Sequence, residues 1–156
     1  MIFINRDYYK DPEKYISFLH FNKRNKFEKR AIDLVIEEEI KEKRKVIVSP
    51  IKEHYDIKSI GNDIRYIEVK AHRKPSSLIK MSISQFNFAK KKGNEYWIYI
   101  VSNIYKNPKI IKIQNPIENM RIIKERREGG CVKIYLKKKS DVNGNSFKWK
   151  NSNINW

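Results

Sequence analysis

Two β-branched segments on either side of a short turn constrain this chain most. Tyr55–Ile60 and Ile64–Lys70 both have the composition of strands, and Gly61-Asn62-Asp63 between them has the turn chemistry of a short hairpin. If these three residues form the whole loop, Asp56 faces Glu68 across the two strands. The local pattern therefore predicts a hairpin that brings two carboxylates together.

The two carboxylates have a chemical consequence. Directly opposed residues of a hairpin lie roughly 4.5–5.5 Å apart at Cβ. Asp56 and Glu68 would repel each other at that distance unless they share a cation or a proton. Lys70 lies two residues beyond Glu68 and on the same face of the strand, whereas Ile67 and Val69 point to the opposite face. Because Mg²⁺ usually takes only one or two protein carboxylates and leaves positions for water and phosphate, this arrangement predicts a metal-dependent nuclease.

The acid-x-lysine triplet alone is a weak signal in so basic a chain. Glu39-Ile40-Lys41 and Asp56-Ile57-Lys58 have the same pattern. Glu68-Val69-Lys70 differs because it lies in a β-branched strand with a second acid opposite. The residues alone leave two alternatives open, a functional site and an ordinary solvated strand face.

The composition independently favours a polyanionic partner. The chain has 35 Lys and Arg against 18 Asp and Glu, a formal net charge of +17 and a sequence pI of about 9.9. Its nine Tyr, seven Phe and three Trp offer stacking surfaces for unpaired bases, with a place in the core as the alternative. Genomic base bias also enriches Lys and Ile, so charge alone does not separate a nuclease from a ribosome-associated protein.

The length, the cysteine count and the apolar segments exclude disulfide-bonded, cysteine-rich zinc and membrane-spanning proteins. The 156 residues fit one domain with a real hydrophobic core. Cys131 is the only cysteine, which excludes an internal disulfide and a cysteine-rich zinc site. The longest uncharged apolar stretch, Tyr96–Tyr105, is too short to span a bilayer, and Met1–Ile4 lacks the length of a signal-peptide core. We therefore expect a cytoplasmic protein without a membrane partner.

Two helices are expected before the hairpin. Asp11 and Pro12 have the pattern of a helix N-terminus and predict a short helix through about Phe21. A second helix is expected to begin near Asn25. Its apolar face, at positions i, i+4, i+7 and i+8, consists of Phe27, Ala31, Leu34 and Val35. Glu28 lies three residues past Asn25, so a capping-box role is its structural interpretation.

The remaining elements complete an α/β pattern. Lys45–Ser49 is expected as the first strand, interrupted by Pro50, and the basic segment Ala71–Pro75 as a loop after the hairpin. Ser84 resembles the N-cap of a helix that ends at Gly93. The later elements are a strand buried on both faces over Tyr96–Val101, a short strand over Ile110–Ile113, and a helix near Glu118 after Asn115-Pro116. The order of helix, three strands, helix and strand predicts an α/β layered domain.

The C-terminal part is less regular. Cys131–Leu136 alternates apolar and polar residues as a strand does, and Asp141–Asn145 has turn chemistry before Phe147-Lys148-Trp149. A terminal hairpin and a basic extension both fit this pattern. Lys137–Lys139 is typical of a solvated charge run, with phosphate contact as the alternative. The predicted organisation is an N-terminal helical extension over 1–24, a central domain over 25–120 and a basic C-terminal extension over 121–156.

An ordered series of motifs resembles a known family. These motifs are Glu28-Lys29-Arg30-Ala31, Tyr55-Asp56-Ile57, Ile67-Glu68-Val69-Lys70, Ser84 with an aromatic-containing helix, Glu95–Val101, and Asn107-Pro108 through Ile113-Gln114-Asn115-Pro116. From about Phe27 to Met120 the chain resembles the protein NO VEIN C-terminal domain family. That family is similar to the PD-(D/E)XK, or restriction-endonuclease-like, nuclease superfamily, which implies a mixed central sheet flanked by helices.

The resemblance implies roles for individual residues. Asp56 and Glu68 match the superfamily's metal-binding acids for Mg²⁺ or Mn²⁺, Lys70 matches its catalytic lysine, and Glu28 matches a helical acid that often reaches the metal through water. His54 stands where the family commonly has glycine, so it narrows the approach of substrate or contacts a phosphate. Family members are often attached to helicase or NTPase modules, which makes such a module an expected partner.

Two functional classes remain at this point. One is a Mg²⁺-dependent endonuclease that hydrolyses DNA phosphodiesters in defence, restriction or repair. The other is a catalytically silent nucleic-acid-binding accessory of a helicase or NTPase. In either class, the candidate nucleic-acid contacts are His54, Lys58, His72, Arg73 and Lys74. RNA stays open as a substrate, and a homodimer stays open as an oligomeric state.

Overall fold

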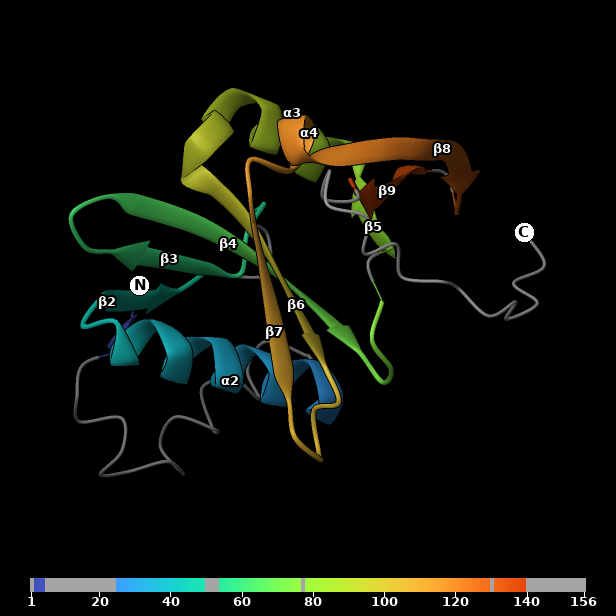
Figure 1. Ribbon diagram of the computed structural model, residues 1–156. Helices are drawn as coiled ribbons and strands as arrows, with labels where there is room; N and C mark the ends of the chain where they lie inside the picture. The colour runs from blue at the N-terminus through green and yellow to red at the C-terminus, as the bar shows by residue number, and fades with distance from the viewer. Residues whose placement is uncertain (1, 5–24, 50–53, 77, 130, 140–156) are drawn as a thin grey trace.

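The computed structural model describes residues 2–4, 25–49, 54–76, 78–129 and 131–139, which form two β-sheets and the helices packed on them (Figure 1). The larger sheet has six strands in the order β1-β2-β3-β4-β6-β7. Its strands are β1 (Ile2–Ile4), β2 (Lys45–Val48), β3 (Ile57–Ile60), β4 (Ile64–His72), β6 (Tyr96–Ser102) and β7 (Lys109–Gln114). The second sheet has three strands in the order β5-β9-β8. They are β5 (Leu78–Ser82), β9 (Cys131–Lys138) and β8 (Met120–Glu128).

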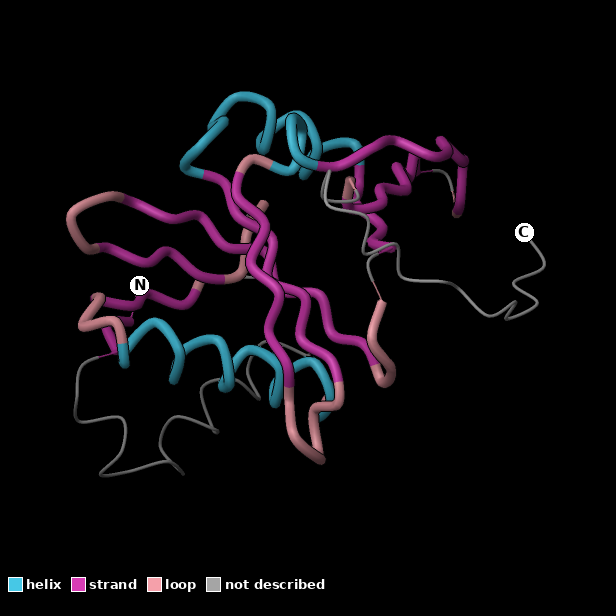
Figure 2. The backbone as a smooth tube through the Cα atoms, in the orientation of Figure 1, coloured by secondary structure: helices cyan, strands magenta, loops and turns pink. Residues whose placement is uncertain are grey.

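The larger sheet is mixed, as the family resemblance implies. β4 and β6 pair in parallel, whereas β1 to β4 and the β6–β7 pair run antiparallel. β6 lies between β4 and β7, and all of its residues except Trp97 are buried. This burial explains its continuous apolar run, because a strand covered on both faces has no solvated side to carry polar residues. Figure 2 shows the two groups of strands as separate layers of the molecule.

The two faces of the larger sheet support two hydrophobic cores. Helix α2 (Lys26–Lys41) packs on one face, where its residues meet Ile67, Tyr99 and Val101. On the other face, the β6 residues Tyr96, Ile98 and Ile100 pack with helix α3 (Ile83–Lys92) and with the smaller sheet. A 3₁₀ turn (Gly93–Glu95) and the short helix α4 (Pro116–Asn119) complete the described elements. Because side chains alternate between faces, Glu68 and Lys70 on β4 share the face of the second core.

Helix α2 begins where the sequence predicts. Asn25 is its N-cap, and the Asn25 Oδ1 accepts a hydrogen bond from the backbone N of Glu28 at 2.8 Å. The predicted apolar stripe faces the sheet: Ala31, Leu34 and Val35 are buried, and Phe27 packs at the rim of the core. The strand at Lys45–Val48, the strand around Ile110–Ile113, the helix near Glu118 and the stop at Gly93, which has φ 57°, are also confirmed.

Two boundaries after the hairpin are wrong in the sequence prediction. β4 continues through His72, so Ala71 and His72 are strand residues, because parallel pairing with β6 extends to the pair of His72 with Ser102. Helix α3 begins at Ile83, with Ser82 rather than Ser84 as its N-cap. Ser82 and Gln85 form a reciprocal capping box, in which the Ser82 hydroxyl accepts from the backbone N of Gln85 and the Gln85 side chain accepts from the backbone N of Ser82.

The smaller sheet contains two strands that were not predicted from the sequence. β8 is mostly charged and shows no alternation, whereas β5 is short and leads directly into α3, although its Ile79-Lys80-Met81-Ser82 does alternate apolar and polar residues. β9 confirms the predicted strand at Cys131–Leu136. It pairs with both β5 and β8, so residues on either side of position 120 share one sheet.

Other predictions fall outside the described residues. They are the helix over about 11–21, the interruption at Pro50, the turn over Asp141–Asn145 and the segment Phe147–Trp149. Within the described residues, no helix is long and apolar enough to cross a membrane.

Candidate active site

The hairpin has the predicted register. Ile60 pairs with Ile64, and Ile57 pairs with Ile67 at the other end of the ladder. The recorded ladder ends at that pair, and the backbone N of Asp56, just before β3, donates to the carbonyl of Ile67 at 2.9 Å. Asp56 and Glu68 are consequently neighbours at the end of the hairpin, as the turn chemistry predicts.

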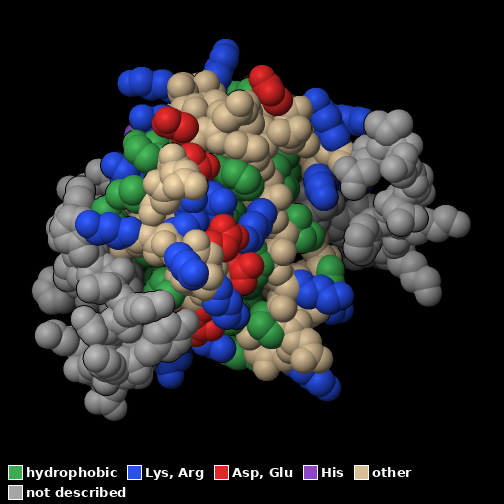
Figure 3. Space-filling model, turned by 60° about the vertical axis from the view of Figure 1, so that its left-hand side comes forward, with side chains coloured by type: hydrophobic (Ala, Val, Ile, Leu, Met, Phe, Trp, Pro, Cys, Tyr) green, Lys and Arg blue, Asp and Glu red, His purple; other side chains and the backbone are tan. Residues whose placement is uncertain are grey.

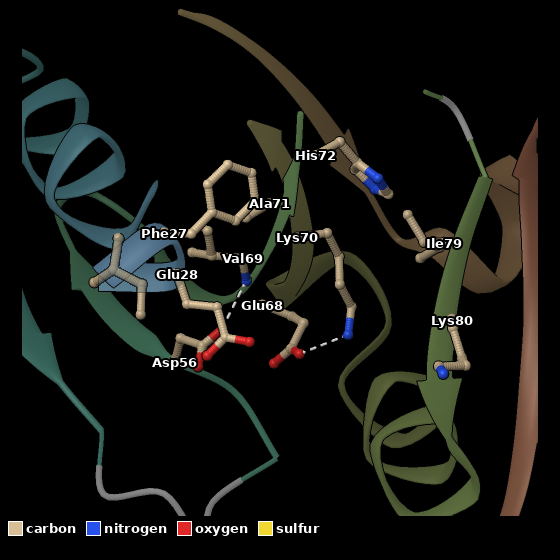
Figure 4. A pocket seen from close by; sticks show the side chains of 11 residues that line it. Phe27, Glu28, Asp56, Glu68, Val69, Lys70, Ala71, His72, Ile79 and Lys80 are labelled. Atoms are coloured by element: carbon tan, nitrogen blue, oxygen red, sulfur yellow. Dashed lines mark hydrogen bonds and ion pairs between the residues drawn. The ribbon is translucent and has the colours of Figure 1, made fainter. Parts of the chain in front are cut away.

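Both acids line one pocket of about 390 Å³ (Figure 4). β4 forms its floor, the first turn of α2 lies on one side, and β5 lies on the other. The lining residues are Phe27, Glu28, Ile32, Asp56, Glu68, Val69, Lys70, Ala71, His72, Ile79 and Lys80. The structure therefore brings together all four residues to which the sequence analysis assigned catalytic roles.

Glu68 is the most buried acid of the pocket, with 6% of its surface exposed. Its Oε1 accepts from Lys70 Nζ at 2.9 Å and from Gln85 Nε2 at 2.8 Å. Both contacts use the same oxygen. The ion pair offsets part of the cost of burying the carboxylate, and the second oxygen, Oε2, has no role in either contact.

Asp56 is held by the backbone of the neighbouring strand. Its Oδ2 accepts from the backbone N of Val69 at 2.8 Å, so the carboxylate is fixed at the edge of β4. The segment before it is anchored by Tyr96, whose hydroxyl donates to the carbonyl of His54 at 2.8 Å. Burial, with the negative charges of Glu68 and Asp56, raises the pKa of Tyr96 well above its usual value. Tyr96 thus stays protonated and keeps donating this bond.

Glu28 lies on the exposed first turn of α2 and points into the pocket. Figure 4 shows its carboxylate beside that of Asp56. The cap contact of α2 uses the backbone N of Glu28, which leaves the side chain available for the pocket. The capping-box interpretation therefore does not account for the position of this side chain.

The acids fit an ion that keeps much of its own water. Among the described residues, no group of three or more His, Cys, Asp or Glu side chains is arranged to hold a metal ion. A closed, fully protein-ligated site, as for structural zinc, is therefore not present there. Mg²⁺ usually binds through one or two carboxylates and retains several waters, and Asp56 and Glu68 supply hard oxygen donors of that kind.

The predicted nucleic-acid contacts separate into two groups. His72 lines the pocket, and the guanidinium of Arg73 lies 5.5 Å from the ring centroid of Phe27 at its rim, followed by the exposed Lys74. His54 and Lys58 do not line the pocket. His54 packs on Phe88 at 5.3 Å between ring centroids, and Lys58 Nζ lies 5.6 Å from the centroid of the Tyr66 ring.

His72 carries a polar atom without a partner. Its Nε2 is buried and has no hydrogen-bond partner within the described part of the chain. Burial, and then the positive charge of Lys70, lowers the pKa of His72 below its usual value, so the ring is neutral near pH 7. An unpaired buried ring nitrogen beside Lys70 is suited to a hydrogen bond with a substrate oxygen.

Two polar residues at the site were not identified from the sequence, Lys80 in the pocket lining and Gln85 beside it. Gln85 reaches Glu68 from the first turn of α3, and its spacing from Ser82 is a capping-box signal that could have drawn attention to it. Lys80 lies on β5 and faces the pocket across from Lys70 (Figure 4). The alternation of Ile79-Lys80-Met81-Ser82 could have identified Lys80 as the exposed residue of a short strand.

Comparison with known proteins places this pocket in a family context. The family model described as "Protein NO VEIN, C-terminal" matches residues 27–113. This range includes α2, the hairpin, β4, β5, α3 and β6 with all the acids of the pocket, and it ends before β8 and β9. The chain matches none of the curated proteins and none of the solved structures.

Proposed function

The chain belongs to the protein NO VEIN C-terminal family, and we propose that its pocket is the active site of a Mg²⁺- or Mn²⁺-dependent nuclease. The observation that carries this proposal is the convergence of Glu28, Asp56 and Glu68 with Lys70 in one pocket of a chain with a net charge of +17. Acidic side chains that line one pocket of a strongly basic protein favour a bound cation there, because neighbouring carboxylates repel each other unless they share a cation or a proton.

The order of elements supports the finer part of the proposal. Helix α2, the β3–β4 hairpin, helix α3 and the parallel strand β6 follow one another around a mixed sheet. This order is what resemblance to the restriction-endonuclease-like superfamily implies. We include that fold, and a cytoplasmic role in defence, restriction or repair beside a helicase or NTPase partner, in the proposal.

Each pocket residue then has a defined task. Asp56 and Glu68 would hold the cation, with Glu28 reaching it through water. The bound cation would stabilise negative charge on the phosphate and lower the pKa of a bound water. Lys70 orients the attacking water and helps to remove its proton, and Gln85 keeps Glu68 in place through its bond to Oε1. The neutral ring of His72 donates a hydrogen bond to a phosphate oxygen.

One observation favours the alternative of a silent accessory module. Lys70 and Gln85 already satisfy Glu68 Oε1 without a cation, so this acid can persist as a structural group. In that case the basic surface would serve a partner enzyme, and the pocket would perform no chemistry.

The experiment incubates the purified chain with supercoiled, linear and single-stranded DNA, and with RNA, in Mg²⁺, Mn²⁺ or EDTA. Cleavage with either metal, lost in EDTA and in Asp56→Ala, supports the nuclease. In parallel, about tenfold more Mg²⁺ than its Kd should stabilise the wild type by roughly 1.4 kcal/mol but not Asp56→Ala or Glu68→Ala. If the chain binds nucleic acid but cleaves none in any metal, and if Mg²⁺ shifts the melting temperature of the wild type and both variants equally, the chain is an accessory module instead.

A further inference from the structure

The outer face of the smaller sheet forms rows of basic side chains. Ile79, Met81, Ile134 and Leu136 point inward and are buried in the second core. The residues between them on β5 and β9, and their partners on β8, therefore point outward. The register aligns Leu78, Lys137 and Arg121 in one row, Lys80, Tyr135 and Lys124 in the next, and Ser82, Lys133 and Arg126 in the last.

These rows place like charges directly opposite each other. Lys137 faces Arg121, and Lys133 faces Arg126, on adjacent antiparallel strands. Like charges in this position destabilise a sheet. Glu128 on the same face contacts Lys80 Nζ at 3.4 Å and also bonds the Tyr135 hydroxyl. A polyanion bound along this face would add negative charge opposite the cationic pairs.

General basicity does not distinguish this surface. Lys and Arg also spread over the face drawn in Figure 3, where Asp and Glu lie among them. The smaller sheet differs because its cations are aligned by strand register. It also differs because Lys80 belongs both to the outward row and to the lining of the pocket. The basic face is therefore continuous with the candidate active site.

We propose that the outer face of the β5-β9-β8 sheet, defined by Lys80, Arg121, Lys124, Arg126, Lys133 and Lys137, binds the phosphate backbone of a nucleic acid and leads it past Lys80 to the pocket. That the face binds nucleic acid is argued from strand register and charge alone. That it leads the nucleic acid to the pocket rests on the proposed nuclease function. β8 and β9 lie beyond the residues that the family model matches, whereas β5 with Lys80 lies within them.

A nucleic acid suits this surface better than an anionic membrane. Membrane binding at a basic surface is strengthened by apolar side chains that enter the lipid from the same face. Ile122 and Ile123 are 49% and 48% exposed, but Ile122 pairs with Leu136 on the inward side, and Ile123 lies at the register shift between Ile122 and Lys124. The outward rows offer cations around Tyr135 instead, which matches phosphates spaced along a strand.

The test compares two variants of equal charge. Arg121→Gln/Arg126→Gln/Lys133→Gln changes the face, and Lys41→Gln/Lys43→Gln/Lys45→Gln changes exposed lysines near the end of α2. Each variant carries three positive charges fewer than the wild type's +17. Binding of a fluorescent DNA duplex and a single strand is measured by anisotropy in EDTA, between 50 and 200 mM salt, so that cleavage cannot influence the result.

We expect the face variant to bind on the order of tenfold or more weakly, with a salt slope shallower by roughly 2.7 for three lost phosphate contacts, and the control variant to bind like the wild type. Equal weakening of both variants would overturn the proposal, because the effect would then be net charge alone. So would unchanged binding by the face variant, or loss of binding only to phosphatidylserine vesicles, which would assign the face to a membrane.

Folding and catalysis are followed separately. Because the substitutions remove like-charge pairs, the melting temperature of the face variant should equal or exceed that of the wild type. If the triple variant melts early, Arg126→Gln alone should still lower the salt slope by about 0.9, and an unchanged slope would overturn the proposal. A wild type that binds through this face but never cleaves would refute the nuclease while leaving the binding surface intact.

Discussion

Glu39 and Glu68 are two buried acids with the same acid-x-lysine pattern and different surroundings. Each begins an acid-x-lysine triplet, ending in Lys41 and Lys70 respectively, and their exposed fractions are 0% and 6%. Glu39 faces the sheet from helix α2, and Glu68 lies on the opposite face of that sheet in β4. Because both acids are buried and both begin such a triplet, neither burial nor the triplet alone can account for the difference between the two sites.

Glu39 is fully satisfied by its neighbours. Its Oε1 accepts from the Tyr99 hydroxyl at 2.6 Å, and its Oε2 accepts from Ser59 Oγ at 2.7 Å. Arg65 Nη1 lies within 3.2 Å of both oxygens, and Arg44 Nε lies 3.2 Å from Oε2. Burial, and then the bond to Glu39, raises the pKa of Tyr99 well above its usual value. This network joins helix and sheet, and Lys41 is exposed and takes no part in the contacts recorded for Glu39.

Glu68 has fewer partners and an open side. Lys70 and Gln85 contact the same oxygen, and the pocket beyond it also contains Asp56 and Glu28. A buried acid surrounded by two arginines serves structure, whereas one beside other acids and a cavity retains capacity for a ligand. An acid-x-lysine triplet therefore indicates a functional site only where a second acid and a pocket accompany it.

The largest expected effect is on the cleavage rate, when the lysine of each triplet is replaced in turn. Lys70→Ala should reduce cleavage by about 100-fold to 10,000-fold, because a positioned group that assists proton transfer contributes on this scale. DNA affinity should change little, since Lys70 is one cation among 35 Lys and Arg. The measurements are single-turnover cleavage in Mg²⁺ and anisotropy in EDTA.

Lys41→Ala is the control, since it removes the lysine of the other triplet from an exposed position. Its cleavage rate should equal that of the wild type. Equal losses of binding and cleavage in Lys70→Ala would assign Lys70 to phosphate binding instead of chemistry.

The second effect concerns the stability of the Glu39 network. Glu39→Ala leaves Arg65 and Arg44, with side chains 16% and 8% exposed, without their shared carboxylate. Breaking a buried ion pair from one side costs about 3–5 kcal/mol, so urea unfolding should show a loss of this size. Glu68→Gln should cost clearly less, because the pocket is open to water. If Glu68→Gln lowered the free energy of unfolding more than Glu39→Ala, Glu68 rather than Glu39 would be the acid that stabilises the fold.

Local chemistry explains which parts of the two sites were predictable. Gly61–Asp63 fixes the hairpin register from three adjacent residues, so the proximity of Asp56 to Glu68 follows from the sequence. The cap at Asn25 and the buried strand at Tyr96–Val101 are equally local signals, and both are confirmed. The predicted elements at the centre of the sheet therefore agree with the structure.

Long-range pairing explains which parts were not predictable. Tyr99 is 60 positions from Glu39 in the chain, and Gln85 is 17 positions from Glu68. No turn or periodicity couples such residues, because their contact depends on how separate elements pack. β8 was missed for a related reason: it is mostly charged and is a strand because β9 pairs with it. β5 also pairs with β9, but its short alternation over Ile79-Lys80-Met81-Ser82 is a local signal that could have been recognised.

A third, smaller effect is expected at Glu28. Glu28→Gln removes the charge that points into the pocket and keeps the backbone amide that Asn25 caps. Thermal stability should therefore stay near that of the wild type, whereas cleavage at limiting Mg²⁺ should fall by about tenfold, as for groups that support a metal through water. Glu37→Gln, on the same helix and paired at 3.9 Å with Arg30, is the matched control. Wild-type turnover in Glu28→Gln at limiting Mg²⁺ would limit the site to Asp56, Glu68 and Lys70.

The smallest effect concerns pH and follows from His72, whose buried Nε2 has no hydrogen-bond partner among the described residues. Arg65 Nε, beside Glu39, is likewise unpaired there, but only the imidazole titrates near neutral pH. Because the pKa of His72 is lowered in the folded state, the unfolded chain binds a proton that the folded chain does not as pH falls below about 6.5. The stability associated with His72 is thus present above that pH and declines below it. The melting temperature of the wild type should fall between pH 7.5 and pH 5.5. His72→Gln should show a shallower decline, and His54→Gln, altered outside the pocket, should keep the wild-type decline. If the melting temperatures of the wild type and His72→Gln declined equally with pH, the pocket would accept a charged ring as readily as water does. The argument for a neutral phosphate donor at this position would then fail.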